Sequence, residues 1–100
     1  MNNIETLNQW LALETEFSTL PDFQKNVKFY VLYKKLAYLY KLILGNDHDL
    51  VISSEARADS YLLNISDEKW RNSLAVNIPT MIQDLPIEIA RMPLKRPEDL

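Results

Sequence analysis

The chain has 100 residues, of which 11 are basic and 14 acidic, with a single glycine and no cysteine. This length is typical of one domain, and its 47% hydrophobic and 25% charged residues argue against wholesale disorder. A single glycine argues against a β-sandwich or barrel, whose tight turns need residues that accept a positive φ, and it excludes a glycine-rich phosphate loop. Without cysteine, neither a disulfide framework nor a thiolate zinc site can form.

Charge is distributed unevenly along the chain, although the net charge is only −3. Residues 25–44 carry five lysines and no acid, whereas residues 1–24 carry four acids and no base, and residues 45–68 carry six acids and one base. The first residues do not resemble a signal peptide, and the longest apolar stretch, residues 29–44, contains three lysines and is shorter than the ~20 residues of a membrane span. We therefore expect a cytoplasmic protein with no membrane partner.

The first half of the chain predicts two helices. The first runs from about Asn3, which can act as N-cap, to Phe17, with apolar residues at helical spacing on one side. The second runs from about Pro21 to Leu44, because a serine or threonine shortly before a proline in the first turn, followed by an acid such as Asp22, is a common helix start. Gly45 would follow in the left-handed conformation that glycine adopts after a helix. The second helix is apolar on nearly all sides, so it should be buried centrally or bury a face in a partner.

The next segment has weaker signals. Residues 50–52 fit either a turn of helix or a brief extended piece. Ser53 or Ser54 can cap a helix that ends near Asn64, and Ser66 can cap the helix that follows. We therefore expect a polar connection after the central helix and two further helical segments.

An apolar stripe at helical spacing continues from Trp70 to Leu85 and passes through Pro79. A proline inside a helix removes a backbone donor and clashes with the preceding turn, at a cost of about 3 kcal/mol. The stripe can belong to one kinked helix or to two short helices, and we favour two, with Pro79 early in the second. From Pro86 onward we expect no regular structure, and residues 92–100 should form an exposed tail.

These elements together predict an all-α fold. It is a small single-domain bundle of four to five helices around a long central helix at about residues 21–44, with short or kinked helices after Pro79. The domain is expected to span residues 1–91. The expected core draws on apolar positions along the whole bundle: Leu7, Leu11, Phe23, Val27, Val31, Leu36, Leu39, Ile43, Leu62, Trp70, Leu74, Ile78 and Met81.

No residues form a recognisable catalytic or metal-binding motif. The only histidine, His48, lies between Asp47 and Asp49, but adjacent loop residues rarely converge on one atom, and no second histidine or any cysteine completes a zinc shell. Glu55 and Asp59 are four residues apart, a spacing more typical of a solvated helix face than of a catalytic pair. We therefore expect a non-enzymatic protein with no catalytic residue, cofactor or metal.

The rings and lysines of the central helix suggest a surface for a protein partner. Tyrosine is enriched in interface hot spots, and four tyrosines on one helix are difficult for a small bundle to bury. Tyr33 and Tyr40 should remain at the surface, and together with Tyr30, Lys34 and Lys41 they form the predicted partner-binding set. The favoured hypothesis is a protein–protein interaction factor, such as an adaptor, inhibitor or immunity-type regulator, which could also pair as a homodimer.

Nucleic-acid binding is the alternative hypothesis. Proteins that bind single strands combine a basic groove with aromatic stacking platforms, and Lys25, Lys28 and Lys35 share one side of the central helix. However, the lysines form two stripes rather than one patch. Arginine, which is preferred for bidentate phosphate and base contacts, is absent from residues 25–44. We therefore favour a protein partner over nucleic acid.

Overall fold

The computed structural model describes residues 2–91 and confirms the all-α fold class. The predicted tail, residues 92–100, lies outside the described residues. Six helices follow one another within this range: α1 (Asn3–Leu11), α2 (Leu13–Phe17), α3 (Asp22–Leu44), α4 (Asp49–Leu63), α5 (Glu68–Met81) and α6 (Ile87–Arg91). Only Ala12, which itself has helical dihedral angles, separates α1 from α2, so the two occupy the single helix predicted there. None of the helices within residues 2–91 is both long enough and apolar enough to cross a membrane.

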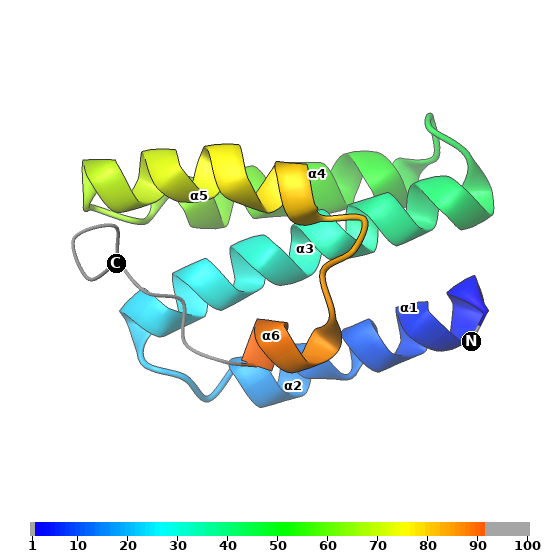
Figure 1. Ribbon diagram of the computed structural model, residues 1–100, viewed down its shortest axis with the longest axis horizontal. Coiled ribbons are helices and arrows are strands. Elements are labelled where there is room, and N and C mark those ends of the chain that lie inside the picture. Colours follow the sequence, from blue (N-terminus) through cyan, green and yellow to red (C-terminus); the bar gives the residue numbers. More distant parts are fainter. Residues whose placement is uncertain (1, 92–100) are drawn as a thin grey trace.

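The central position of α3 is confirmed. The first two helices pack on one side of it and α4 packs on another, while α5 and α6 lie in front (Figure 1). α1 and α4 pack on α3 rather than on each other. Seven consecutive residues of α3, 27–33, are buried, which agrees with its nearly all-round apolar composition. Side chains of the neighbouring helices therefore cover this part of α3.

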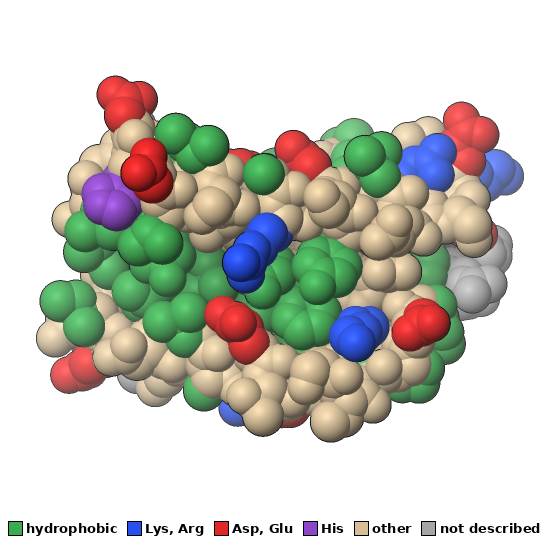
Figure 2. Space-filling model, turned by 180° about the vertical axis from the view of Figure 1, so that it is seen from behind, with side chains coloured by type: hydrophobic (Ala, Val, Ile, Leu, Met, Phe, Trp, Pro, Cys, Tyr) green, Lys and Arg blue, Asp and Glu red, His purple; other side chains and the backbone are tan. Residues whose placement is uncertain are grey.

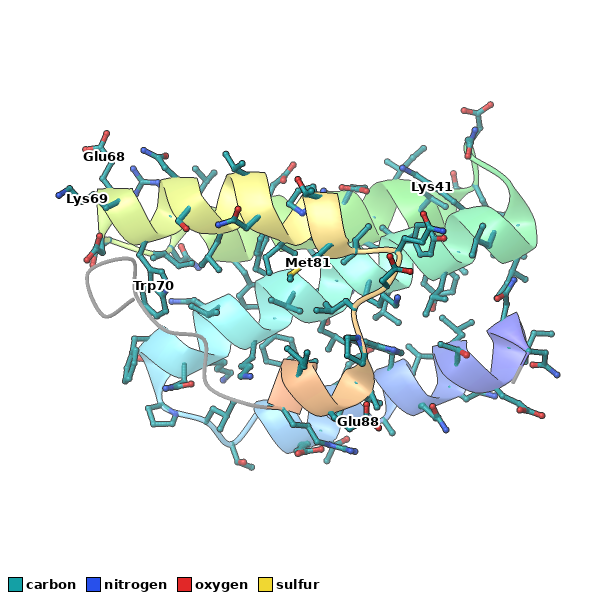
Figure 3. All side chains as sticks on the ribbon, in the orientation of Figure 1. Lys41, Glu68, Lys69, Trp70, Met81 and Glu88 are labelled. Carbon is teal, nitrogen blue, oxygen red and sulfur yellow. The ribbon has the colours of Figure 1, made fainter. Side chains whose placement is uncertain are left out.

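The core is largely the predicted one, with errors near helix ends. Most of the expected positions in α3 and α5 are buried, and several others are half-buried. Phe23 and Met81 were expected in the core but are 51% and 43% exposed, because they lie in the first turn of α3 and at the last residue of α5. Figure 3 shows how core and surface residues alternate at the start of α5: Trp70 points towards α3, while Glu68 and Lys69 point away from the bundle.

Polar side chains cap the starts of several helices by accepting hydrogen bonds from backbone N–H groups. In some of these helices the capping residue is not the one predicted. Asn2 rather than Asn3 caps α1, and its Oδ1 accepts a hydrogen bond from Glu5 N at 2.8 Å. Asp67 rather than Ser66 caps α5. These shifts of one residue are within the usual uncertainty of helix boundaries.

Helix α4 begins earlier than predicted because His48 is its N-cap. The His48 Nδ1 atom accepts a hydrogen bond from Leu50 N at 3.1 Å, so residues 50–52 form a helical turn, one of the two conformations predicted. Ser54, a predicted cap, is instead buried within the helix. The only histidine of the sequence therefore has a structural role at the end of a short interhelical turn.

Pro79 does not divide the segment into two helices, so the favoured expectation was wrong there. The helix α5 continues to Met81, and Pro79 occupies its last turn. The carbonyl that loses its donor belongs to Ala75, an exposed residue, so water can replace the missing hydrogen bond. The absence of regular structure after Pro86 was also wrong, because α6 follows and Ala90 N donates to the Pro86 carbonyl at 3.3 Å.

Gly45 ends α3, as predicted, but in a different conformation. Its φ of 96° is positive and its ψ of 163° is extended, so it does not adopt the left-handed helical conformation. Its N–H still donates to the Lys41 carbonyl at 3.0 Å. Only glycine readily adopts this combination of φ and ψ, whereas for other residues it raises the conformational energy by about 1–3 kcal/mol.

We therefore predict that Gly45→Ala lowers the free energy of unfolding by about 1–3 kcal/mol. A Cβ atom at this position would meet no atom within 4 Å, so the loss would come from the backbone alone. Equilibrium urea unfolding monitored by circular dichroism measures it, with Asn46→Ala in the same turn as the control. Equal stability of the two variants would contradict the prediction.

Candidate protein-binding surface

Two lysines predicted as nucleic-acid contacts are buried instead. The side chains of Lys28 and Lys35 are only 2% and 4% exposed. The Lys28 Nζ atom donates to the Ala90 carbonyl in α6. The Lys35 Nζ atom donates to the carbonyl oxygens of Ile82 and Gln83, at 2.8 and 3.0 Å, just after α5. Both ammonium groups therefore satisfy carbonyls at helix C-termini, where a positive charge is favoured.

Each buried ammonium group lies over at least one aromatic ring. The Lys28 Nζ atom lies 5.9 Å from the centroid of the Phe17 ring, and Lys35 Nζ lies 5.6 Å from that of Trp10. Burial lowers the pKa of Lys28 to about 8, although the nearby Glu16 opposes the shift. The same cause lowers the pKa of Lys35. These lysines hold the C-terminal part of the described chain against α3, so two of the charges that the nucleic-acid alternative requires at the surface lie inside the fold.

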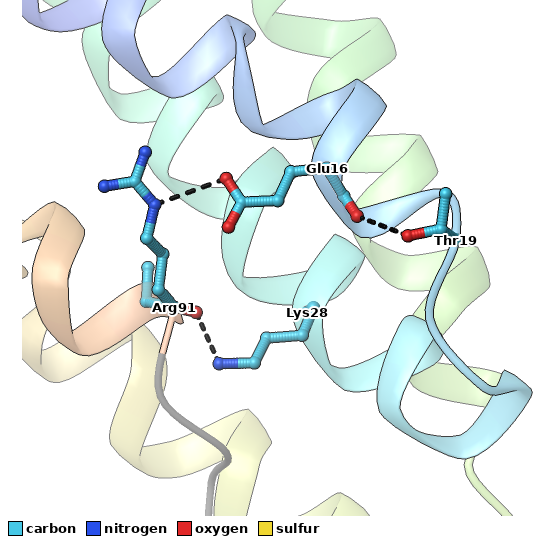
Figure 4. A network of polar contacts seen from close by, with 5 residues as sticks. Glu16, Thr19, Lys28 and Arg91 are labelled. Atoms are coloured by element: carbon cyan, nitrogen blue, oxygen red, sulfur yellow. Dashed lines mark hydrogen bonds and ion pairs between the residues drawn. The ribbon is translucent and has the colours of Figure 1, made fainter.

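An ion pair supports the same attachment of α6. Arg91 Nε lies 3.2 Å from Glu16 Oε2, close to the contact between Lys28 and α6 (Figure 4). Both partners are half exposed, so the pair contributes little stability by itself. Together these contacts explain why a five-residue helix, too short to be stable alone, is found at this position.

The predicted partner-binding residues do not form a single surface. Lys34 Nζ lies 2.7 Å from Glu55 Oε2, and Lys41 Nζ lies 3.8 Å from Glu55 Oε1, so both lysines link α3 to α4. Tyr30 is only 2% exposed, and burial, with smaller effects of Asp59 and Glu55, raises its pKa to about 12. The expected exposure of this set is therefore wrong for Tyr30, while Lys34 and Lys41 serve the packing of α4.

Tyr33 belongs to a cluster of three nearly parallel rings. The ring centroids of Phe29 and Tyr33 are 5.7 Å apart, and Tyr61 in α4 lies 5.0 Å from the first and 5.9 Å from the second. The angles between the ring planes are 12–19°. Tyr33 is only 6% exposed, so its predicted exposure was wrong: the rings of neighbouring residues and the side chain of Arg57 cover it.

Arg57 extends over this ring cluster from α4. Its guanidinium carbon lies 5.5 Å from the centroid of Tyr33, and its Nη1 donates to the Tyr33 hydroxyl at 3.3 Å. Burial is the main cause that raises the pKa of Tyr33, and the Arg57 hydrogen bond opposes it. The pKa of Arg57 is raised by Tyr33 and, to a smaller extent, by Glu14 of α2. Residues of three different helices thus meet at one place.

The surface around this cluster continues along the three helices at helical spacing. Tyr40 and Leu44 follow Tyr33 by seven and eleven residues on α3, and Leu50 precedes Arg57 by seven on α4. We call this surface the tyrosine face, and its residues are Leu7, Leu11, Glu14, Tyr33, Tyr40, Leu44, Leu50, Arg57 and Tyr61. Tyr40 is half-buried, and Leu44 and Leu50 are 43% and 42% exposed.

The tyrosine face lies on the side of the molecule opposite α5 and α6. Figure 2 shows it as an apolar band between α4 and the α1–α2 segment, with a basic and an acidic side chain on opposite sides of its middle. Neither Arg57 nor Glu14 forms an ion pair with another residue of the range 2–91. The apolar strip thus carries one basic side chain on its α4 side and one acidic side chain on its α1–α2 side, and the two lie close together across its middle.

Sequence reasoning missed the contribution of α4 to this surface. Leu50, Arg57 and Tyr61 recur at intervals of seven and four, which places them on one side of a helix. That spacing was a usable signal, but it becomes informative only when the helix begins at residue 49. Within residues 2–91, no three histidine, aspartate or glutamate side chains gather as metal ligands would.

Comparisons of this chain with protein-family models, with curated proteins and with solved structures give no match. Its function must therefore be inferred from its own surface.

Proposed function

We propose that this protein is a non-enzymatic protein–protein interaction factor, such as an adaptor, inhibitor or immunity-type regulator, which binds a partner protein through the tyrosine face. The observation that carries the proposal is the part of this face that solvent reaches, which comprises Leu44, Leu50 and Arg57 together with the half-buried Tyr40 and with Tyr61 of the ring cluster. Tyrosine and arginine are the residue types that most often dominate binding energy at protein interfaces.

The packing of this cluster favours binding in a second way. Its rings already hold one another nearly parallel, and Arg57 is held by the Tyr33 hydroxyl. Side chains that are ordered before binding lose less conformational entropy when a partner docks. The exposed Leu44 and Leu50 beside them would add apolar area to the contact.

The alternative, nucleic-acid binding, has less support. Lys28 and Lys35 are engaged with backbone carbonyls inside the fold, which leaves Lys25 as the only half-exposed lysine of that predicted set. A single lysine gives little of the phosphate neutralisation on which such binding depends. The homodimer and the cytoplasmic location remain predictions.

We predict that Leu50→Asp weakens partner binding while Leu63→Asp does not. Both leucines lie on α4 and are exposed, at 42% and 75%, but Leu63 points to the opposite side of the helix, about 220° away at 100° per residue. A charge placed in an apolar contact costs several kcal/mol, so the loss should exceed tenfold.

Affinity capture from lysate of the source cells, with quantitative mass spectrometry, measures this effect. Circular dichroism first establishes that both variants are folded. At least one protein should be recovered with the wild type and with Leu63→Asp and be depleted with Leu50→Asp. Recovery that is equal for both variants, or no recovered protein at all, would count against the proposal.

A further inference from the structure

The two long sides of α3 are covered differently. In front, α5 packs against α3 and α4 and buries Trp70, Leu74 and Ile78, and α6 packs nearby against α3 (Figure 1). On the opposite side, none of the helices within residues 2–91 lies over the tyrosine face, and α1 and α4 do not close over it because each packs on α3. The front of α3 thus has its covering helix, and the equivalent position behind it is open.

We infer that the tyrosine face binds one amphipathic helix of a partner protein, aligned with α3 and lying between α4 and the α1–α2 segment. This inference rests on the proposed function and specifies the kind of partner. The face follows α3 from Tyr33 to Leu44, a separation of eleven residues or about 17 Å at 1.5 Å per residue. A partner helix of about three turns matches that length and would place apolar residues at i, i+4, i+7 and i+11 over the strip.

The charges at the two edges specify the partner helix further. The guanidinium of Arg57 has five N–H groups, and Tyr33 takes a hydrogen bond from one of its nitrogens, so it can still bind a carboxylate through two donors. Glu14 on the α1–α2 side would favour a lysine or arginine. By contrast, Lys34, Lys41 and Arg91 already have acidic partners within the fold. The matching helix therefore carries an acid on its α4 side and a base on its α1–α2 side.

Selection from a display library tests this inference without a known partner. The library presents 16-residue peptides with eight randomised positions on a helical scaffold, and the wild-type protein is the target. We expect enriched peptides to carry apolar residues at the spacing of one helix face, with an acid on one flank and a base on the other. Enriched peptides without helical spacing would overturn the inference.

Variants at the edge of the face then test the charge arrangement. The dissociation constant of an enriched peptide should rise at least tenfold with Arg57→Glu and with Leu50→Asp, and it should not change with Leu63→Asp. Changing the peptide's acid to lysine should restore binding to Arg57→Glu. Arg57→Gln, which keeps a donor for Tyr33, should have an intermediate effect. Dissociation constants that do not respond to Leu50→Asp or Arg57→Glu would overturn the inference.

A second copy of the chain is the competing occupant. Analytical ultracentrifugation of the wild type and of Leu50→Asp distinguishes it, because a dimer that Leu50→Asp dissociates would place another copy on the face and overturn the helix inference. If lysate capture depends on Leu50 but no helical peptide is selected, the inference fails and the proposed function stands. If neither capture nor peptide binding depends on Leu50, both fail.

Discussion

Replacing Trp10 with alanine is expected to lower the free energy of unfolding by about 3–5 kcal/mol, the usual loss when a large buried aromatic side chain is removed. The Trp10 side chain is only 2% exposed and fixes α1 against α3. Its ring also lies 5.6 Å from Lys35 Nζ, which holds the carbonyls of Ile82 and Gln83 after α5. The change would therefore weaken two separate attachments to α3.

The effect is large for a domain of this size, because such domains are stable by only about 5–15 kcal/mol. Urea unfolding followed by circular dichroism measures it without interference from the fluorescence of Trp70. Ile4→Ala is the control, since Ile4 lies on the same helix but is 58% exposed and should cost less than about 0.5 kcal/mol. A Trp10→Ala variant within 1 kcal/mol of the wild type would show that the packing of α1 is not a major source of stability.

The free energy of unfolding is also expected to rise between about pH 8 and pH 10. Burial lowers the pKa of Lys28 to about 8, against 10.5 for an unperturbed lysine. Between these values the unfolded chain binds more protons than the folded one, so raising the pH favours the folded state. One such group contributes a slope of up to about 1.4 kcal/mol per pH unit. Lys35 acts in the same direction.

At higher pH the trend should reverse because of the buried tyrosines. The pKa of Tyr30 is raised to about 12 and that of Tyr33 is raised as well. Above the ordinary tyrosine pKa of 10.0 the unfolded chain loses these protons first, so stability falls as the pH rises further. The wild type should therefore be most stable near about pH 10, between the titration of the lysines and that of the tyrosines.

Urea unfolding at intervals from about pH 7 to pH 10 measures the rise. The Lys28→Met variant should rise less steeply than the wild type, because methionine fills a similar volume without a titrating group. Lys69→Met, at an exposed position of α5, should follow the wild-type curve. Identical slopes in the wild type and in Lys28→Met would mean that Lys28 is not the group responsible.

The comparison of α3 with the segments after it shows which parts of the fold were predictable. The bounds of α3 follow from a proline near its start, a glycine after its end and apolar residues on all sides, all of which act within a few residues. The prediction of two helices divided at Pro79 was wrong. The free-energy cost of a proline inside a helix depends on whether water reaches the carbonyl that loses its donor, here that of Ala75, and this depends on which side of α5 faces the bundle.

The candidate site was predicted in part. The tyrosines of the central helix indicated the correct helix, and Tyr33 and Tyr40 do share one of its sides. The burial of Tyr33 could not be predicted, because it depends on Arg57 and Tyr61, which lie more than twenty residues further along the chain. Spacing within one helix identifies which residues lie together, but it does not identify which other helix covers them.

The sequence alone determined the all-α class, the long central helix and its end at Gly45, because helical periodicity and the backbone freedom of glycine are local properties. Tertiary packing decided the environment of the lysines. Lys28 and Lys35 look like surface charges in the sequence, yet α5 and α6 place C-terminal carbonyls where these ammonium groups can reach them. The net charge of −3 likewise conceals an arrangement that only the packed helices create, in which Arg57 of α4 and Glu14 of α2 come close enough to interact electrostatically.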